Sequence, residues 1–380
     1  MCVHINHDSH IACRDKRLYK YLSKNLYCIQ DALWCIKMGV NIKDIVVKNE
    51  IMLGDLSGKA FTVDAFNILY QFLSTIRQRD GSLLTDSKGN VTSHLTGLFA
   101  RTTRLMQNGI RLAFVFDGEP PVLKKKERER RARLKDDAHS RFKAAEKSED
   151  IDGMRKYAAR TSKLTKDMID EAKALVKALG LPCIEAPSEG EAQAAHIVRK
   201  GEVYGCISQD YDNLLFGVPR MVQNLTISER RKVKSSLSYE SFHPQMIELD
   251  EVLTKNMITR EQLVAVGVLV GTDFDIGGIP GIGPKNAIKL VKQHGHDFDT
   301  LFSDQKWEEH FDYPYTDVMD VFLKMKVSDD YALSWKNPDL DKIKEILCEN
   351  HDFSVDRVET TLKSLDEYKN NQKQKSLFDF

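Results

Sequence analysis

A chain of 380 residues with 42% hydrophobic residues is long enough to bury one large core or two closely joined ones. Lysine plus arginine equals aspartate plus glutamate, 56 each, so the net charge alone predicts no polyanionic partner. No apolar run approaches the ~18 residues that span a membrane, and the N-terminus lacks the apolar stretch of a secretory signal. Seven cysteines without a CxxC pair are typical of reduced thiols. We therefore expect a cytoplasmic protein without membrane contact.

The first 37 residues differ from the rest of the chain, because they hold four of the seven cysteines and a group of histidines. The side chains with metal-ligand chemistry are Cys2, His4, His7, His10 and Cys13. Their spacing matches no common zinc pattern. We interpret residues 1–37 as an atypical extension, a non-native leader before a start at Met38, with a metal site as the alternative.

From Met38 onward the chain alternates short apolar runs with helix-like stretches. In chain order the pattern predicts a strand at 61–63, helices at 66–76 and 93–107, a strand at 112–116, a helix at 167–179, strands at 182–185, 204–208, 221–225 and 236–239, and helices within 259–291 and 310–370. This alternation predicts an α/β fold with a mostly parallel twisted sheet flanked by helices. Ligands of such sheets bind outside the carboxyl ends of the strands.

Carboxylates recur at those ends of the predicted strands and at the starts of helices. They are Asp64, Asp117, Glu189, Glu191, Asp210, Asp212 and Asp273. Any one of them is explained as well by a helix N-cap, but caps do not account for all seven with two acid-x-acid pairs. Hard oxygen donors without a His or Cys cluster select Mg²⁺ or Mn²⁺ over zinc. Two such ions can activate water and stabilise the leaving oxygen of a phosphoryl displacement.

A basic run follows one of these acids. Seven carboxylates exceed the charge of two divalent ions, so a phosphodiester needs nearby cations to approach. Residues 124–135 supply Lys124, Lys125, Lys126, Arg128, Arg130, Arg131, Arg133 and Lys135 against two glutamates. A charged run is usually a solvated helix face, but the short distance from Asp117 favours phosphate binding here.

A glycine-rich turn, GIGPKNA at 281–287, lies between two apolar helical stretches. Gly281 and Gly283 permit a tight turn that brings backbone N–H groups to a phosphate at a helix N-terminus. Lys285 and Lys289 add attraction that does not depend on sequence. An ordinary interhelical turn is the alternative, but the motif is more typical of a helix–hairpin–helix that binds a DNA backbone.

Together these motifs resemble a known family. VDA (63–65), VFDGEPP (115–121), APSEGEA (186–192), QDYD (209–212) and GTD (271–273) resemble the flap endonucleases, structure-specific 5′ nucleases of the XPG/Rad2 type. The match runs in order from Met38 to the C-terminus. It implies a PIN-like nuclease core with a helical arch and a helix–hairpin–helix. It also implies 5′-flap endonuclease and 5′–3′ exonuclease activity in Okazaki-fragment maturation and long-patch base excision repair.

The resemblance also implies roles for matching residues. Asp64, Asp117, Glu189 and Glu191 would surround one Mg²⁺ and Glu191, Asp210, Asp212 and Asp273 a second, with Mn²⁺ as a substitute. Lys124 and Arg131 would steer the scissile phosphate. The implied DNA contacts are Tyr70, stacked on a terminal base, then Arg77, Arg101, Arg104, Gly271, Gly281, Gly283 and Lys285, with a monovalent cation at the hairpin. A core position for Tyr70 and mere surface solubility for the arginines are the alternatives.

The implied organisation divides the chain into regions. These are an N-terminal nuclease region (38–135), an arch for the 5′ flap (119–165), an internal region (153–295) with the hairpin at 277–291, a C-terminal helical region (296–370) and a terminal peptide (372–380). The mixed charges of the arch predict a segment disordered until DNA binds. In the family the residue after the start methionine, here Gly39, lies near the active site, where 37 further residues would crowd the DNA.

The terminal peptide resembles those that dock on the sliding clamp PCNA. Gln374, Leu377, Phe378 and Phe380 place apolar anchors on one side of a short turn, although the final aromatic pair is incomplete and a frayed hydrophobic end is the alternative. The absence of a long basic tail resembles archaeal members. We therefore expect a monomeric, nucleoid-associated nuclease with branched DNA and PCNA as partners. Three rivals remain: another 5′ nuclease for junctions or excision repair, a catalytically silent DNA-binding clamp partner, and a smaller PIN-type ribonuclease.

Overall fold

The computed structural model describes residues 39–78, 80–148, 150–158, 161–225, 230–232, 239–241 and 243–378, with the backbone alone at 151–152, 155, 230–232, 239–241 and 368–378. The N-terminal extension and most of the predicted strand at 236–239 lie outside these residues. One compact unit begins at Gly39 and contains every feature described below. Within the described residues, no helix has the length and apolar character to cross a membrane.

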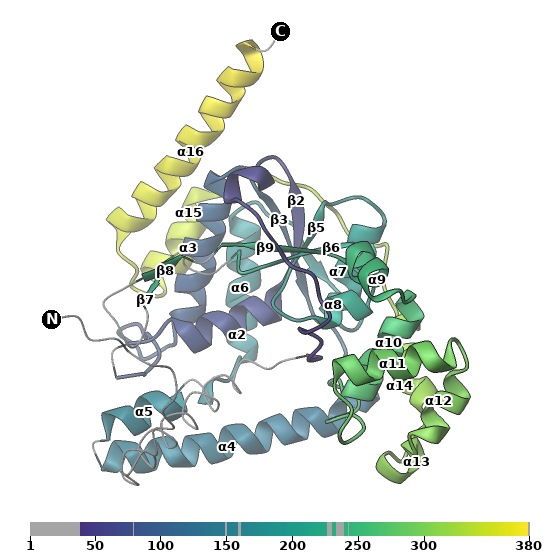
Figure 1. Cartoon of the computed structure of the whole chain (residues 1–380). Helices are drawn as coiled ribbons and strands as arrows, with labels where there is room; N and C mark the ends of the chain where they lie inside the picture. The colour runs from purple at the N-terminus through teal and green to yellow at the C-terminus, as the bar shows by residue number, and fades with distance from the viewer. Residues whose placement is uncertain are drawn as a thin grey trace, which may run out of the picture. The chain divides into compact units, whose positions relative to one another are not determined.

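A mostly parallel sheet forms the centre of this unit, which confirms the predicted α/β class (Figure 1). Its order is β1-β9-β6-β5-β2-β3-β4. The neighbouring pairs from β6 through to β4 are parallel, whereas β9 is antiparallel to both β6 and β1. The strands are β1 Asn49–Glu50, β2 Ala60–Asp64, β3 Arg111–Phe116, β4 Cys183–Glu185, β5 Gly205–Ile207, β6 Arg220–Gln223 and β9 Gln245–Glu248; β7 Arg230–Lys232 and β8 Tyr239–Ser241 pair separately.

Helices cover both faces of the sheet because successive strand residues point to opposite sides. In β3, Leu112, Phe114 and Phe116 pack into one apolar cluster, and Ala113 and Val115 into the other. The first cluster includes α2 Ala65–Thr75, α3 Ser93–Gln107, α6 Lys166–Ala178, α15 Leu340–Lys344 and α16 Val355–Phe378. The second includes α7 Gly190–Arg199, α8 Asp212–Leu215, α9 Leu249–Asn256, α10 Arg260–Val270, α11 Pro284–His294, α12 Phe298–Asp304, α13 Trp307–His310 and α14 Tyr315–Lys324.

The described residues also form three short helical turns: the 3-10 turns η1 Leu53–Leu56 and η2 Val122–Lys124, and the π-helical turn η4 Glu345–Glu349. The region 310–370, predicted to contain helices, is helical in α14, α15 and α16, but the chain between α14 and α15 has no helix. Tertiary contacts hold this connection, since Trp335 Nε1 donates to the Leu112 carbonyl (2.8 Å) and the Lys336 amide donates to the Gly180 carbonyl (2.8 Å). Pro338 also disfavours helical backbone at the residue before it.

The described part of the arch is helical, and disorder of this segment without DNA stays a prediction from its composition. It consists of α4 Lys125–Lys147 and α5 Ile151–Ala158, and α4 is the long helix beneath the sheet in Figure 1. Opposite charges three or four residues apart stabilise a helix. Glu127 contacts Arg130 and Arg131 in this way, and Asp137 contacts Arg141 at 3.1 Å. The mixed charges that suggested disorder therefore act as pairs along one helix.

Candidate metal centre and DNA interface

The seven predicted carboxylates are carried by the carboxyl ends of neighbouring strands and the helices that follow them. Asp64 ends β2, Asp117 follows β3, Asp210 follows β5 and Asp212 begins α8; Glu189 and Glu191 begin α7, and Asp273 follows α10. Strands β3, β2 and β5 are adjacent and parallel, so their ends open on the same edge of the sheet. The topology thus brings together residues that lie more than 200 positions apart in the chain.

Asp64 is both a helix N-cap and a member of the acidic cluster, the two interpretations that the sequence left open. As the N-cap of α2 its Oδ1 accepts a hydrogen bond from the Asn67 amide (3.0 Å). The same residue is buried beside Glu189 and Lys124, which both act on its charge. The Asn67 side chain in turn donates to Asp210 Oδ2 at 2.5 Å. Capping and membership of the acidic cluster are therefore compatible.

Burial makes the charged form of these acids costly. It is the largest cause that raises the pKa of Asp64 to about 6 and the pKa values of Asp117 and Asp212 to about 7. The pKa values of Glu191 and Asp210 also lie well above their usual range, first from burial and then from repulsion by Asp212. The cluster therefore carries more negative charge than the protein compensates.

The acids fall into two groups by the neighbours whose charges act on them. Asp117 is affected by Asp64, Glu189 and Lys124. Asp210 is affected by Asp212 and Asp273 as well as Asp64. Glu191 lies between the groups, because Asp212, Asp64 and Asp210 all act on it. Asp64 acts on members of both groups, so the acids interact as one cluster, and their division between two metal sites stays what the family resemblance implies.

Two cations from the base of the arch contact the acids. Lys124 Nζ donates to Glu189 and lies 3.9 Å from Asp273 Oδ2. The Arg131 guanidinium donates to Asp273 Oδ1 at 2.6 Å. Although burial opposes it, the neighbouring carboxylates Glu189 and Asp273 raise the pKa of Lys124, so this ammonium stays charged. Two cations cannot balance seven carboxylates, and the remaining negative charge fits divalent cations.

The carboxylate oxygens currently contact the protein itself. Among the described residues, no three His, Cys, Asp or Glu side chains are already arranged around a metal position. Their oxygens accept from Lys124, Arg131 and two amides, Asn67 and Asn213, the latter at 3.0 Å from Glu191 Oε1. The donor set is oxygen throughout, as Mg²⁺ prefers. The chemistry of the donor set therefore fits Mg²⁺.

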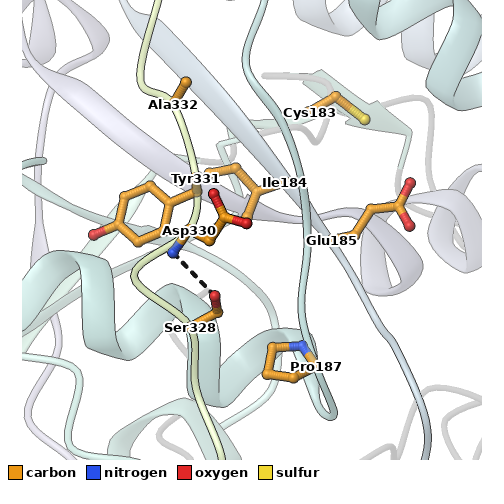
Figure 2. Close-up of a pocket in the computed structure, with 8 residues that line it drawn as sticks. All are labelled: Cys183, Ile184, Glu185, Pro187, Ser328, Asp330, Tyr331 and Ala332. Atoms are coloured by element: carbon orange, nitrogen blue, oxygen red, sulfur yellow. Dashed lines mark hydrogen bonds between the residues drawn. The ribbon is translucent and has the colours of Figure 1, made fainter.

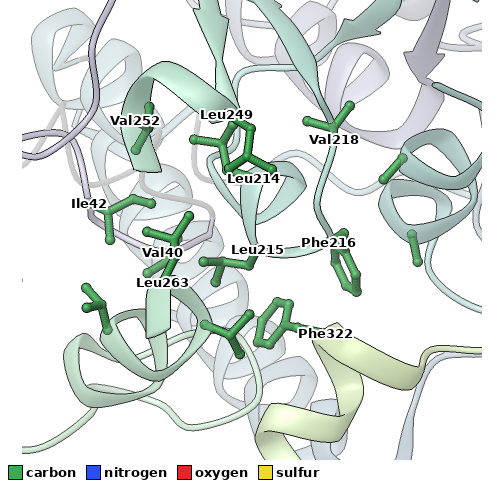
Figure 3. Packing of buried hydrophobic residues seen from close by; sticks show 14 of the residues in the cluster. Val40, Ile42, Leu214, Leu215, Phe216, Val218, Leu249, Val252, Leu263 and Phe322 are labelled. Carbon is green, nitrogen blue, oxygen red and sulfur yellow. The ribbon is translucent and has the colours of Figure 1, made fainter. Parts of the chain in front are cut away.

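Backbone amides also reach the cluster, which sequence reasoning missed. The Val40 amide donates to Asp212 Oδ1 (2.7 Å), and the Gly190 amide donates to Asp117 Oδ1 (2.8 Å). A Cβ on Gly190 would lie 2.6 Å from that same oxygen. Figure 3 shows Val40 packed near Leu215 and Leu263, so its apolar side chain fixes the position of its amide. The sequence signal for this contact is Gly190 itself, which lies between Glu189 and Glu191 where a side chain would collide with Asp117.

The predicted duplex contacts lie on α2, α3 and the loop between them. Tyr70 is half-buried on α2, with Lys135 Nζ 4.7 Å from its ring centre, so it is not a core residue. Arg77 donates to the Gly81 carbonyl (2.8 Å) and to Ser162. Burial, then repulsion by Arg104 one turn away, lowers the pKa of Arg101. A phosphate near Arg101 and Arg104 would favour the charged form of both side chains.

The predicted hairpin connects α10 to α11. Gly271 (φ +102°) follows α10, and a Cβ there would collide with the Gly278 backbone, so both must be glycine. Gly281 (φ +83°) and Gly283, the N-cap of α11, have open space around their Cα atoms. Lys285 is exposed in the first turn. An open helix N-terminus beside a lysine is suited to a phosphate.

The terminal peptide is described only in part. The backbone of Gln374, Leu377 and Phe378 belongs to α16, whereas their side chains and all of Phe380 lie outside the described residues. A separate pocket of about 340 Å³ lies between β4 and residues 328–332 (Figure 2). Its lining includes Cys183, Glu185, Asp330 and Tyr331 and none of the seven clustered acids. It is therefore distinct from the candidate metal centre.

Comparison with known proteins agrees with this geometry. Residues 38–138 match the XPG N-terminal domain and residues 180–273 match the XPG I-region, which defines an XPG-type nuclease fold. Flap endonuclease 1 of Aeropyrum pernix is 47% identical over 331 residues, 86% of this chain and 94% of that protein. Flap endonuclease 1 of Pyrococcus abyssi is 48% identical over 328 residues, with the same coverage.

Solved structures give the same result. Flap endonuclease-1 from Methanococcus jannaschii superposes with a TM-score of 0.69 at 41% identity, covering 88% of this chain and 100% of that one. The catalytic core of Rad2 in complex with DNA substrate gives a TM-score of 0.61 at 25% identity, covering 84% and 96%. The chain belongs to the flap endonuclease family.

Proposed function

We propose that this chain is a divalent-metal-dependent nuclease that cuts DNA at the base of 5′ flaps and also degrades 5′ ends in the 5′-to-3′ direction. One observation carries the proposal: seven interacting carboxylates at one edge of a parallel sheet are faced by Lys124 and Arg131 from the arch. Okazaki-fragment maturation and long-patch base excision repair both need such a cut. The enzyme would act in the cytoplasm, at the nucleoid.

The two groups of acids would hold two Mg²⁺ ions, which Mn²⁺ would replace. Asp64, Asp117, Glu189 and Glu191 would bind the first, and Glu191, Asp210, Asp212 and Asp273 the second. Bound ions of this kind lower the pKa of a water and stabilise charge on a leaving oxygen. The oxygen donors, the raised pKa values and the shortage of protein cations all support this assignment.

Lys124 and Arg131 would bind and orient the scissile phosphate. Both contact acids of the cluster now, Glu189 and Asp273 respectively. With those acids neutralised, the same donors would turn to the non-bridging oxygens and stabilise the negative charge that develops during cleavage. Their position at the start of α4 suits this role, because both side chains already reach acids of the cluster.

The remaining predicted residues would position the DNA. Arg77, Arg101 and Arg104 would bind the duplex backbone, and Tyr70 would stack on the terminal base near the cut. Gly271, Gly281, Gly283 and Lys285 would form the hairpin that binds a second stretch of backbone, with a monovalent cation bound beside it. The arch of α4 and α5 would surround the single-stranded 5′ flap.

The terminal peptide would attach the nuclease, itself a monomer, to a sliding clamp of the PCNA type. Gln374, Leu377, Phe378 and Phe380 would supply the anchors, and their spacing alone supports this assignment. A matched pair of peptides, residues 368–380 with and without alanine at Leu377 and Phe378, tests it by titration against PCNA.

Cleavage of labelled DNA tests the nuclease proposal. Wild type and Asp210→Ala would be incubated with single-flap, four-way-junction and blunt duplex DNA, with Mg²⁺ or with EDTA. We expect wild type to cut the flap only with Mg²⁺ and Asp210→Ala to cut nothing. Absence of flap cleavage by wild type would overturn the enzymatic proposal, and cleavage of junctions alone would favour a junction-resolving nuclease.

A further inference from the structure

Glu127 is an unusual residue for its place in the chain. It lies in the first turn of α4, among charged neighbours on both sides that are exposed, yet its own side chain is only 3% exposed. Glutamate is rarely buried unless it is paired. No motif in the sequence singles it out, since it is one acid inside a basic run.

The contacts of Glu127 explain its burial. Its two oxygens accept from Arg130 Nε (2.6 Å) and the adjacent terminal nitrogen of Arg130 (2.8 Å). Oε1 also accepts from Arg131 Nε at 2.6 Å. Although burial opposes it, hydrogen bonds from Arg130 and Arg131 lower the pKa of Glu127. The carboxylate therefore stays ionised and binds both guanidinium groups.

The orientation of Arg131 depends on this contact. Its guanidinium is held at Nε by Glu127, and its terminal nitrogen donates to Asp273 Oδ1 at 2.6 Å. A guanidinium is planar and rigid, so a hydrogen bond that holds Nε also sets the direction of the adjacent terminal nitrogen. Glu127 thus sets the direction of the donor that reaches the acidic cluster.

An ordinary surface ion pair does not account for these observations. Exposed pairs four residues apart on a helix contribute about 0.3–0.5 kcal/mol and leave both side chains mobile. Here the acid is buried, both of its oxygens are used, and Arg131 is itself only 29% exposed. Lys124, Glu127 and Arg131 also follow one another at helical spacing, on the side of α4 that faces Asp273 and Glu189.

We propose that Glu127 is a positioning residue for phosphodiester cleavage, which acts by aiming the Arg131 guanidinium at the site of the scissile phosphate. This inference rests on the proposed nuclease function. In this proposal Glu127 acts through Arg131 and does not itself contact DNA. Misplacement of a donor by about 1 Å can cost on the order of 100-fold in rate. The loss of Glu127 should therefore lower the rate of cleavage while DNA binding is retained.

Glu127→Gln tests this, because glutamine keeps the shape of the side chain but not its charge. We expect the single-turnover rate of flap cleavage in Mg²⁺ to fall about 10- to 100-fold. The Kd for the same DNA in Ca²⁺, measured by fluorescence anisotropy, should change less than about twofold. Glu129→Gln, at an exposed position two residues away, is the matched control and should match wild type in both measurements.

A double-mutant cycle separates positioning from a general effect on the helix. If Glu127 acts through Arg131, then Glu127→Gln should cause no further loss of rate in an Arg131→Ala background. An equal loss in both backgrounds would overturn the inference, as would a wild-type rate for Glu127→Gln alone. A loss of helical circular dichroism together with weaker DNA binding would instead assign Glu127 a purely structural role. If wild type itself fails to cut flaps, the proposed function fails rather than this inference.

Discussion

The backbone amide of Val40 donates a 2.7 Å hydrogen bond to Oδ1 of Asp212, so the backbone at the start of the compact unit reaches the acidic cluster. Gly39, just before it, has φ +74°, and a Cβ there would lie 3.0 Å from Asp212 Oδ2. The hydrogen bond from Val40 to Asp212 joins residues 172 positions apart in the chain. It makes the path of the backbone at Gly39 part of the candidate metal centre.

Gly39→Ala should therefore lower flap cleavage. The added methyl group meets the Asp212 carboxylate, and left-handed backbone is unfavourable for alanine. We expect a fall of about tenfold or more in the single-turnover rate, with the protein still folded by circular dichroism. Gly54→Ala is the matched control, since a Cβ at Gly54 meets nothing within 4 Å. Equal rates for the two variants would show that the close approach of Gly39 to Asp212 does not affect the rate of cleavage.

The raised pKa values predict how the stability of the metal-free protein varies with pH. Asp212 has a pKa of about 7 in the folded chain, chiefly from burial, against 3.8 when unfolded. Between these values the folded state binds the proton that the unfolded state has released, so the free energy of unfolding falls as pH rises. Asp212→Asn cannot ionise but keeps an acceptor for Val40. In EDTA it should match wild type near pH 4 and exceed it by about 1–3 kcal/mol at pH 8.

Metal binding should show the opposite pH dependence, because the ligands must lose their protons. Mg²⁺ should raise the Tm of wild type more at pH 8 than at pH 5.5, and should raise that of Asp212→Asn little at either pH. Differential scanning calorimetry measures all four cases. A Mg²⁺ response in wild type that does not vary with pH would contradict the assignment of these acids as ligands.

Lys124 offers a separate test of charge balance. It contacts Glu189 and lies near Asp273, so its removal leaves both acids with less compensation. Lys124→Ala should lower the Tm in EDTA, and Mg²⁺ should restore most of that loss. It should also lower the cleavage rate on the order of 100-fold at saturating DNA, as expected when one donor to a developing oxyanion is removed. A normal rate would remove Lys124 from the proposed mechanism.

The sequence predicted the sheet and its acids because both depend on local patterns. Helix 93–107 matches α3, and the acids follow strands in a way that any parallel sheet brings together. The contacts that hold the acids were not predictable by the same means. Asn67 and Gly190 contact Asp210 and Asp117 across 143 and 73 positions. The buried state of Glu127 likewise depends on where the arch meets the core, which no periodicity within 124–135 reveals.

Lys285 should contribute to DNA binding without contributing to catalysis. It is exposed at the start of α11, beside Gly281 and Gly283, and has no contact with the acidic cluster among the described interactions. Lys285→Ala should weaken the Kd for flap and plain duplex DNA alike, by about two- to fivefold, and reduce the slope of log K against log salt by about one. Fluorescence anisotropy over a KCl series measures both quantities. The single-turnover rate at saturating DNA should stay at the wild-type value, because a phosphate bound at the hairpin would not be the one that is cut. An unchanged salt slope would show that Lys285 contacts no phosphate. A lower rate at saturating DNA would show that Lys285 also contributes to the cleavage step.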